Sequence, residues 1–309
     1  MPNWNEVIQE INAVGQSNQA VNPFDVVRRK YLKQIHDITG RNVIAYYSGW
    51  LQKPTAADTA VNDKDKSGFM LAIHKLDKTK GLDLLLHTPG GDIAATESLV
   101  DYLYAMFGKD IRVIVPQISM SAGTMIALSA KEIIMGKHSN LGPIDPQFNG
   151  IACQAVVNEF KQAVADIQSN PSSAILWQTI ISKYHPTFLG ACQQAIEWSE
   201  RMVSAWLNHN MCNGDGERVK KILTTFSNHQ EQKSHARHIP KSECLDAGVT
   251  VLNLEDDQNL QDAVLTTHHM YFHTFSNTTA VKLIENQNGT AYVENQAIQQ
   301  PRQVVMQQQ

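Results

Sequence analysis

Residues 82–91 read LDLLLHTPGG and residues 111–124 read IRVIVPQISMSAGT, and each stretch joins an apolar run to a turn of small residues. Each run is short and almost continuously apolar, as expected of a strand that is covered on both faces of a sheet. A segment with the length and apolar content of a helix follows each turn, over residues 93–107 and up to Ala130. The two stretches therefore predict consecutive strand–helix units of a parallel α/β sheet.

The same alternation extends to both sides of these units. Residues 43–47 predict an earlier strand and residues 132–136 a later one, because both runs are apolar and β-branched or aromatic. A polar loop is expected over residues 53–66 and a helix over residues 68–76. Residues 151–228 carry apolar side chains at helical spacing, which predicts a helical cap over the sheet.

The two ends of the chain predict additions to this domain. Residues 249–254 indicate a late strand, and residues 280–285 and 290–294 predict a hairpin closed by an Asn-Gly turn. The glutamine-rich end from Gln296 is expected to be disordered. We therefore expect a helical N-terminal arm over residues 1–40, an α/β domain over 41–255 with a helical insertion over about 151–228, and a C-terminal helix and hairpin extension over 256–309 that ends in the disordered tail.

The composition argues against several classes of protein. The chain has 309 residues, 42% of them hydrophobic and 18% charged, so it is long enough to bury a full core. A formal net charge of -4 leaves no basic surface of the kind that nucleic-acid binding needs, and no nucleic-acid partner is expected. No run approaches the roughly 20 apolar residues of a membrane span, and the start lacks a signal-peptide pattern, so we expect a cytoplasmic protein. The scattered cysteines predict reduced packing residues rather than disulfides or a zinc site: Cys153, Cys192, Cys212 and Cys244.

The two turns form the candidate site, because open α/β sheets place their sites at the carboxyl ends of the strands. In the glycine turn (residues 88–91), Gly90 and Gly91 allow backbone N–H groups to face a ligand, which suits an oxyanion hole; a plain turn is the alternative. In the serine turn (residues 119–124), Ser121 lies at the positive end of a helix dipole among small neighbours, as a nucleophile would; an N-cap serine is the alternative. Side by side, the turns would direct the N–H groups of Gly91 and Ala122 at one bound oxygen next to Ser121 Oγ.

Together these motifs resemble the Clp protease proteolytic subunit and signal peptide peptidase A group, and more closely the serine dehydrogenase proteinase family of Clp-fold peptidases. The matching stretches span roughly residues 25–252: residues 28–32 (RRKYL), 39–42 (TGRN), 46–49 (YYSG), the two turns, 141–147 (LGPIDPQ), and His235 ahead of Glu243 and Gly248. The resemblance implies the Clp-protease and crotonase superfold for the α/β domain. It also implies a serine peptidase without a cofactor, which acts on a peptide or protein substrate through an acyl-enzyme at Ser121.

The resemblance further implies that Asp145 is the orienting carboxylate and His235 the general base. A serine nucleophile needs a base within hydrogen-bond reach, and the base needs a partner that fixes its tautomer. The identity of the base stays open, because His238 lies three residues further on and His229 is also near. The distance from His235 to Gly248 matches the family motif and favours His235.

A lysine base is the mechanistic alternative, because signal peptide peptidase A-like enzymes resemble this chain in fold and use a Ser–Lys dyad. Lys183 is the first candidate and Lys161 the second, and either would need burial to lower its pKa. Two further functions compete: a crotonase-like acyl-CoA enzyme, and a non-catalytic assembly protein on the same scaffold. No metal is expected, because His268, His269 and His273 lack supporting carboxylate or cysteine spacing and read as surface residues.

The resemblance implies a homo-oligomer, since related folds work as rings or stacked assemblies. The sequence does not indicate the number of subunits, the peptide preference, an unfoldase partner or substrates at a membrane.

Overall fold

The centre of the molecule is a seven-stranded, mostly parallel sheet. A computed structural model of the chain describes residues 4–17, 19–227 and 234–296. The sheet has the strand order β10-β5-β3-β2-β1-β11-β12, in which the first five strands run parallel to one another, β11 pairs antiparallel with β1, and β12 pairs antiparallel with β11. Its strands are β1 (Asn42–Ser48), β2 (Leu82–His87), β3 (Ile111–Val115), β5 (Glu132–Met135), β10 (Val251–Asn253), β11 (Ala280–Asn286) and β12 (Ala291–Asn295). The predicted α/β fold with parallel strand–helix units is confirmed.

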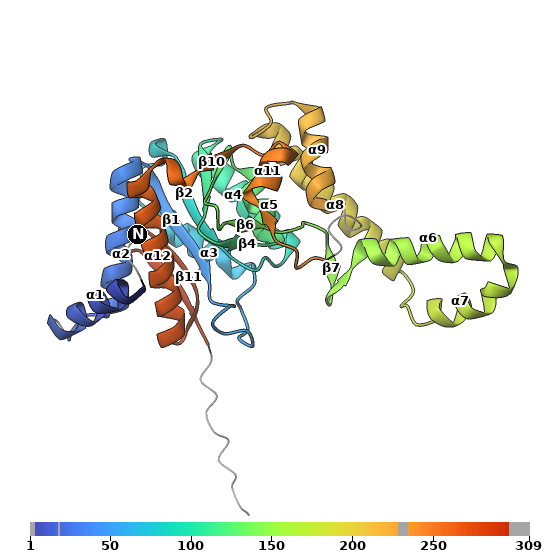
Figure 1. Ribbon diagram of the computed structural model, residues 1–309, viewed down its shortest axis with the longest axis horizontal. Helices are drawn as coiled ribbons and strands as arrows, with labels where there is room; N and C mark the ends of the chain where they lie inside the picture. Colours follow the sequence, from blue (N-terminus) through green and yellow to red (C-terminus); the bar gives the residue numbers. More distant parts are fainter. Residues whose placement is uncertain (1–3, 18, 228–233, 297–309) are drawn as a thin grey trace, which may run out of the picture.

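Helices cover both faces of this sheet (Figure 1). They are α1 (Trp4–Ser17), α2 (Pro23–Thr39), α3 (Lys64–Ile73), α4 (Ile93–Phe107), α5 (Ala122–Ser129), α6 (Cys153–Ser169), α7 (Ala174–Ile181), α8 (Phe188–His209), α9 (Gly216–Ser227), α11 (Lys241–Ala247) and α12 (Gln258–Asn277). Single 3₁₀ turns are η1 (Lys78–Lys80), η2 (Pro171–Ser173) and η3 (Leu254–Asp256). α3 begins inside the stretch expected to be a loop.

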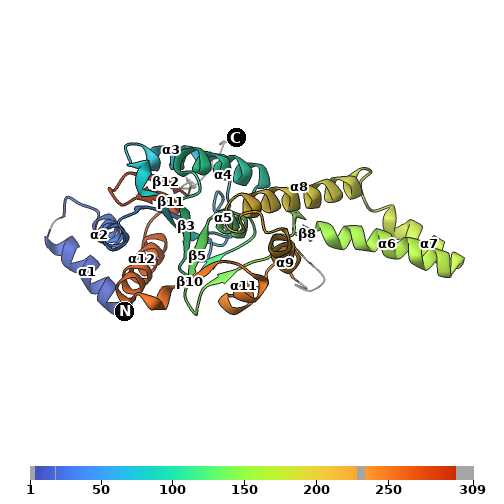
Figure 2. The ribbon, with the colours of Figure 1, turned by 90° about the horizontal axis from the view of Figure 1, so that it is seen from above.

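The order of the strands decides which helices share a face. β1, β2, β3 and β5 are neighbours in chain order, and connections of one hand between such strands place every connecting helix on the same side. α3, α4 and α5 accordingly pack on one face, while α2 and α12 cover the other (Figure 2). The strands are therefore buried on both sides: in β1, Ile44 and Tyr46 join the core under α3 to α5, whereas Val43 and Tyr47 join the core under α2 and α12.

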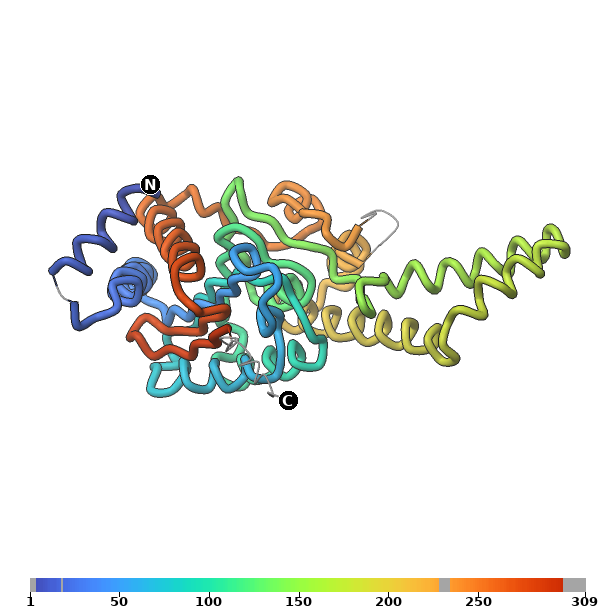
Figure 3. The backbone as a smooth tube through the Cα atoms, turned by 90° about the horizontal axis from the view of Figure 1, so that it is seen from below, coloured from blue at the N-terminus to red at the C-terminus, as the bar shows by residue number. Residues whose placement is uncertain are grey.

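The predicted helical insertion divides into an inner and an outer part. The C-terminal half of α8 belongs to the main core through Met202, Val203 and Trp206, and α9 packs beside it. α6 and α7 project from the body together with the start of α8, rather than lying over the sheet as the predicted cap would (Figure 3). α6 and α8 bury apolar side chains against each other, among them Cys153 and Cys192, so this arm has a small core of its own.

The C-terminal hairpin is part of the main sheet. β11 pairs with β1, and β12 pairs with β11, at the positions where a hairpin was predicted. Beyond Gln296, the glutamine-rich tail lies outside the described residues. Within the described ranges, no helix combines the length and apolar composition that crossing a bilayer requires.

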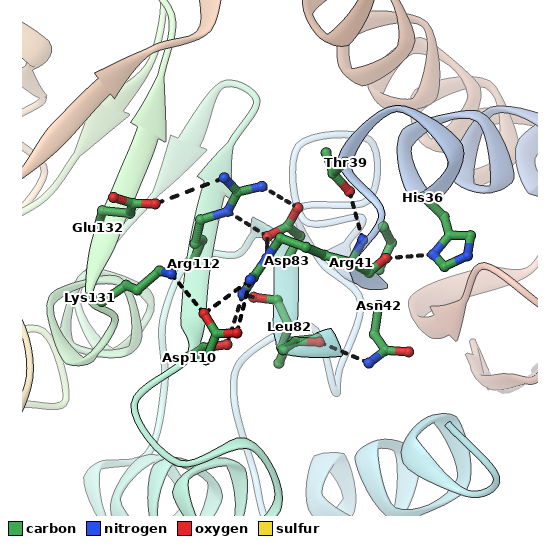
Figure 4. Close-up of polar contacts among 12 residues, drawn as sticks. His36, Thr39, Arg41, Asn42, Leu82, Asp83, Asp110, Arg112, Lys131 and Glu132 are labelled. Carbon is green, nitrogen blue, oxygen red and sulfur yellow. Dashed lines mark hydrogen bonds and ion pairs between the residues drawn. The ribbon is translucent and has the colours of Figure 1, made fainter. Parts of the chain in front are cut away.

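A cluster of paired charges lies at the amino ends of the parallel strands (Figure 4). Asp83 of β2 is fully buried and accepts hydrogen bonds from Arg112 at 2.7 Å to each oxygen and from Arg41 at 2.7 Å. Asp110 pairs in turn with Arg41 and Lys131. This edge of the sheet is therefore held by ion pairs, opposite the edge where the two turns lie.

Candidate functional site

The glycine turn and the serine turn lie against each other at the carboxyl ends of the strands. Thr88 forms a bridge with Ser119, and the N–H of Met120 donates to the carbonyl of Thr88 at 3.0 Å. A Cβ atom on Gly90 would lie 2.6 Å from the carbonyl oxygen of Met120 and 2.7 Å from Ser121 Cβ, which is closer than real Cβ contacts come. Gly90 also has a φ of 92°, so only glycine fits where the turns touch.

Ser121 has a strained backbone at the entrance to α5. Its φ of 50° and ψ of -118° lie in a region that non-glycine residues rarely occupy. An N-cap serine has extended backbone angles and accepts a hydrogen bond from the first turn, whereas Ser121 makes no such bond. Strain of this kind costs about 1–3 kcal/mol and gathers at functional sites. The N-cap interpretation therefore does not describe Ser121, and its geometry resembles the strained strand-to-helix turn that exposes a nucleophilic serine.

A small second sheet brings three distant segments together. It consists of β4 (Ile118–Ser119), β6 (Asn140–Leu141) and β9 (Ile239–Pro240), with β6 in the middle. β4 runs parallel to β6, and β9 runs antiparallel to it. Ser121 follows β4, Asp145 follows β6, and His235 precedes β9, so all three side chains come from the same end of this sheet.

Asp145 and His235 form a hydrogen-bonded pair. His235 Nδ1 lies 2.7 Å from Asp145 Oδ1, and the Asp145 side chain is 2% exposed. The backbone on both sides of Asp145 is held, because the N–H of Ile144 donates to Phe226 at 2.9 Å and the carbonyl of Pro146 accepts from Cys153 at 3.0 Å. A carboxylate only accepts hydrogen bonds, so Nδ1 carries the proton and Nε2 of the neutral ring is left as a base.

Ser121 and His235 line one cavity of about 650 Å³. Strand β7 (Gln147–Phe148), which forms a hairpin with β8 (Ile151–Ala152), contributes to the wall of this cavity. The apolar side chains in the wall include Ile93, Met125, Phe148, Ala195 and Trp198. A second cavity of about 480 Å³ adjoins it and shares Pro89, Gln147 and His235. Among the described residues no hydrogen bond joins Ser121 to His235, and catalytic hydrogen bonds are often long before a substrate binds.

The other candidate bases lie elsewhere. His238 is exposed and lines the second cavity. Lys183 is exposed in the connection between α7 and α8, and Lys161 is exposed on α6. The described residues that line the Ser121 cavity include no lysine. His229 lies outside the described residues.

The predicted oxyanion donors differ in what their N–H groups do. The N–H of Gly90 donates to Thr88 Oγ1 at 3.2 Å, so Gly90 contributes its shape to the site and not a donor. Ala122 is the first residue of α5, where backbone N–H groups have no partner inside the helix. Within the described chain, the N–H groups of Gly91 and Ala122 donate no hydrogen bond, and of these two residues Gly91 lines the cavity with Ser121.

Two polar residues that the sequence analysis did not single out tie the site together. Thr124 Oγ1 donates to the carbonyl of Ser119 at 2.8 Å and accepts from the N–H of Gly142 at 2.9 Å, which joins the serine turn to the segment before Asp145. His87 Nδ1 lies 3.1 Å from the carbonyl of Ile118 and joins β2 to β4. Burial lowers the pKa of His87 to about 3, so the ring is neutral and donates this bond. The signal available in the sequence was a polar residue within an apolar stretch.

The histidines of α12 are not surface residues as expected. His268 and His273 are buried and His269 is half-buried, because α12 packs against α1 and the sheet. Within the described part of the chain, no group of three or more histidine, cysteine, aspartate or glutamate side chains is arranged to hold a metal ion.

Comparison with known proteins adds a family and two relatives. Residues 26–232 match the family described as ClpP-like SDH-type serine proteinases. An uncharacterized protein of Methanocaldococcus jannaschii, MJ0137, is 30% identical over 208 residues, which are 67% of this chain and 64% of that protein. Another from the same organism, MJ1495, is 35% identical over 97 residues, 31% of this chain and 33% of that protein. The chain therefore spans less than two thirds of either relative, and the family match contains Ser121 and Asp145 and ends just before His235.

Proposed function

The chain belongs to the family of ClpP-like SDH-type serine proteinases, and on that premise we propose that it hydrolyses peptide bonds through an acyl-enzyme at Ser121. Membership supports a serine peptidase as the general class, and the roles of single residues rest on the geometry. One observation carries the proposal: His235, hydrogen-bonded to the buried Asp145, lines the same cavity as the strained Ser121.

In the first half of the reaction, Ser121 Oγ attacks the carbonyl carbon of the scissile bond while His235 Nε2 takes the hydroxyl proton. The carbonyl oxygen becomes an oxyanion, to which the N–H groups of Gly91 and Ala122 donate. His235 then gives its proton to the leaving amine as the C–N bond breaks, and the acyl group stays on Ser121. Asp145 keeps Nδ1 protonated throughout and stabilises the imidazolium.

In the second half, water replaces the amine. His235 takes a proton from the water, which attacks the ester carbonyl, and the same two N–H groups hold the second oxyanion. Collapse of this intermediate returns the proton to Ser121 Oγ and releases the carboxylic acid product. Apart from the attacking water, every group that reacts with the substrate in this cycle belongs to this chain.

The competing functions have less support. A Ser–Lys dyad needs a buried lysine at the serine, whereas Lys183 is exposed and outside the described lining of the cavity. Crotonase-like chemistry uses paired N–H groups without a serine, and so leaves the strain at Ser121 without a function. A non-catalytic scaffold likewise has no need of the Asp145–His235 pair. A homo-oligomer and a peptide or protein substrate stay predictions.

Labelling with a fluorophosphonate probe tests the proposal directly. The full chain is incubated with the probe, and intact mass and peptide mapping locate the adduct. We expect a single adduct on Ser121, none on Ser121→Ala, and labelling at least about 10²-fold slower for His235→Ala, because the base no longer activates the serine.

Ser129→Ala is the matched control, since Ser129 is a buried serine at the far end of the same helix. It should be labelled as fast as the wild type. An unlabelled wild type, under conditions in which a known serine peptidase reacts, contradicts the proposed function. Labelling that survives Ser121→Ala contradicts the assignment of the nucleophile.

A further inference from the structure

A buried ion pair lies behind the segment that contacts the glycine turn. Lys282 of β11 and Asp65 of α3 are each 1% exposed, and Lys282 Nζ lies 2.8 Å from Asp65 Oδ1. Removing two charges from water is costly, and apolar residues of similar volume often serve stability as well or better. Stability alone therefore gives no reason for this pair.

The pair holds three consecutive residues from both ends. Lys282 Nζ donates a second hydrogen bond to the carbonyl of Ala60 at 2.6 Å. Asp65 Oδ2 accepts one from the N–H of Asn62 at 2.9 Å. Val61 lies between these two anchored groups and is itself buried, so its backbone has a set position.

Val61 in turn contacts the glycine turn through its backbone. Its N–H donates to the carbonyl of Gly90 at 2.8 Å, and its carbonyl accepts from the N–H of Asp92 at 2.9 Å. These bonds bracket Gly91, which approaches Val61 so closely that a Cβ atom would lie 2.3 Å from the Val61 oxygen. The peptide groups on both sides of Gly91 are therefore oriented by Val61.

We propose that Lys282 and Asp65 are positioning residues for the oxyanion hole: by anchoring residues 60–62 they hold Val61 against the glycine turn and direct the N–H of Gly91 into the cavity that Ser121 lines. The proposal rests on the proposed function for its catalytic meaning. It also makes the hole depend on β11, a strand outside the part of the chain that matches the family.

Neither residue is placed to react with a substrate. Both side chains are buried, and the described lining of the Ser121 cavity includes neither of them, although it includes Ala60. Burial lowers the pKa of Lys282, and the charge of Asp65 opposes that change. The hydroxyl of Tyr46 donates to Asp65 Oδ2 at 2.6 Å and completes the carboxylate's set of partners.

The same strand offers a matched control. Glu285 of β11 is as deeply buried as Lys282 and pairs with the buried Arg28 of α2. This second pair also contacts Tyr271 and Thr274 of α12, so it lies on the opposite face of the sheet from α3. Its loss removes a buried ion pair without touching residues 60–62.

The experiment compares Lys282→Met with Arg28→Met in the full chain at a temperature well below both melting points. Two readouts are the second-order rate of fluorophosphonate labelling and hydrogen exchange of backbone amides in residues 58–63 and 88–93. We expect labelling of Lys282→Met to slow about 10- to 100-fold, since removing one donor of an oxyanion hole costs about 10²- to 10³-fold and a misdirected donor loses only part of that. Exchange at Asp92 should speed up at least about 10-fold, because Val61 no longer holds its N–H. Arg28→Met should change both readouts less than about threefold.

A double variant, Lys282→Met with Asp65→Leu, separates positioning from stability. An apolar pair should restore much of the melting temperature while the labelling rate stays low, because nothing anchors residues 60–62. Recovery of the labelling rate together with the melting temperature overturns the proposal, as does unchanged exchange at Asp92 in Lys282→Met. If the wild type is not labelled at all, the proposed function fails on its own, and the exchange measurement still decides whether the pair positions the turn.

Discussion

The two edges of the parallel sheet are built from the same strands and hold opposite kinds of structure. At the amino ends, the buried Asp83 is fully engaged by Arg41 and Arg112, and exposed charges extend the cluster. At the carboxyl ends, Ser121 is strained, and the N–H groups of Gly91 and Ala122 are available. At the amino ends the charged groups are paired, whereas at the carboxyl ends two backbone donors of the described chain have no hydrogen-bond partner. Strain and unsatisfied donors persist at one edge because the rest of the sheet over-determines its position.

Removing the nucleophile should produce the largest difference between the edges. In Ser121→Ala, peptide hydrolysis should fall about 10⁶-fold, as when a nucleophile is lost from a catalytic triad. Ser121→Gly should be equally inactive. Its free energy of unfolding should exceed that of Ser121→Ala by about 1 kcal/mol, because glycine adopts a φ of 50° without strain. Fluorogenic peptide hydrolysis and urea unfolding measure the two effects. A Ser121→Gly variant less stable than Ser121→Ala contradicts the assigned strain.

Asp145→Asn should come next, with a rate loss of about 10⁴-fold. The amide cannot hold Nδ1 of His235 in the protonated form and stabilise the imidazolium. Single-turnover labelling with a fluorophosphonate measures the loss, and the melting temperature should change little by comparison. A rate within tenfold of the wild type would remove Asp145 from the proposed mechanism.

The reverse experiment is Asp83→Asn at the amino edge. Losing the charge leaves two arginines facing a neutral group, which should destabilise the fold by about 3 kcal/mol or more. Because the cluster lies at the other end of the strands, the labelling rate should stay within twofold of the wild type. Denaturant unfolding and labelling, measured on the same sample, check both parts. A large rate loss without destabilisation would mean that the two edges are coupled.

Two glycines sharpen the comparison at the level of single contacts. In Gly90→Ala the added Cβ atom would clash with the serine turn. At Gly108, before β3, an added Cβ atom has no neighbour within 4 Å. Both have a positive φ, so both alanine variants should lose about 1 kcal/mol from backbone strain. Gly90→Ala should lose roughly 1–3 kcal/mol more and slow labelling, because the clash displaces Ser121. Equal losses in the two variants would contradict the close contact.

The last expected effect concerns the dependence of stability on pH, and it leaves the nucleophile untouched. The folded-state pKa of His87 is lowered by burial from 6.5 to about 3. Below pH 6.5 the unfolded chain binds a proton that the folded chain excludes, so the free energy of unfolding falls as the pH falls toward 3. At pH 5 this contribution is about 2 kcal/mol. His87→Asn keeps a donor for Ile118 and does not titrate, so between pH 7.5 and pH 5 it should lose about 2 kcal/mol less than the wild type in urea unfolding.

His268 lies against His87 and is a second buried histidine that contributes to the pH dependence of stability. Burial also lowers the pKa of His268 well below 6.5, so His87→Asn should keep part of the acid destabilisation. An unchanged pH dependence in His87→Asn would mean that His87 is protonated in the folded state.

Much of the candidate site could be predicted from local sequence pattern. The two turns were found because each follows an apolar run and precedes a helical segment, and parallel strands bring their carboxyl ends together. The same reasoning predicts that the N–H groups of Gly91 and Ala122 act together with Ser121, which stays a prediction. Asp145 and His235 came only from the resemblance to a family, since two residues 90 positions apart share no local pattern.

The sequence by itself determined the order of strands and helices and the position of the two turns, because the period of apolar residues and the small turn residues are local properties. Only the tertiary structure decided how distant segments meet. The two-residue strands β4, β6 and β9 are too short to show a period, yet their pairing gathers Ser121, Asp145 and His235. Lysine is usually a surface residue, so the sequence alone does not predict that Lys282 is buried. Its burial against Asp65 depends on the pairing of β11 with β1, two strands that are far apart in the sequence.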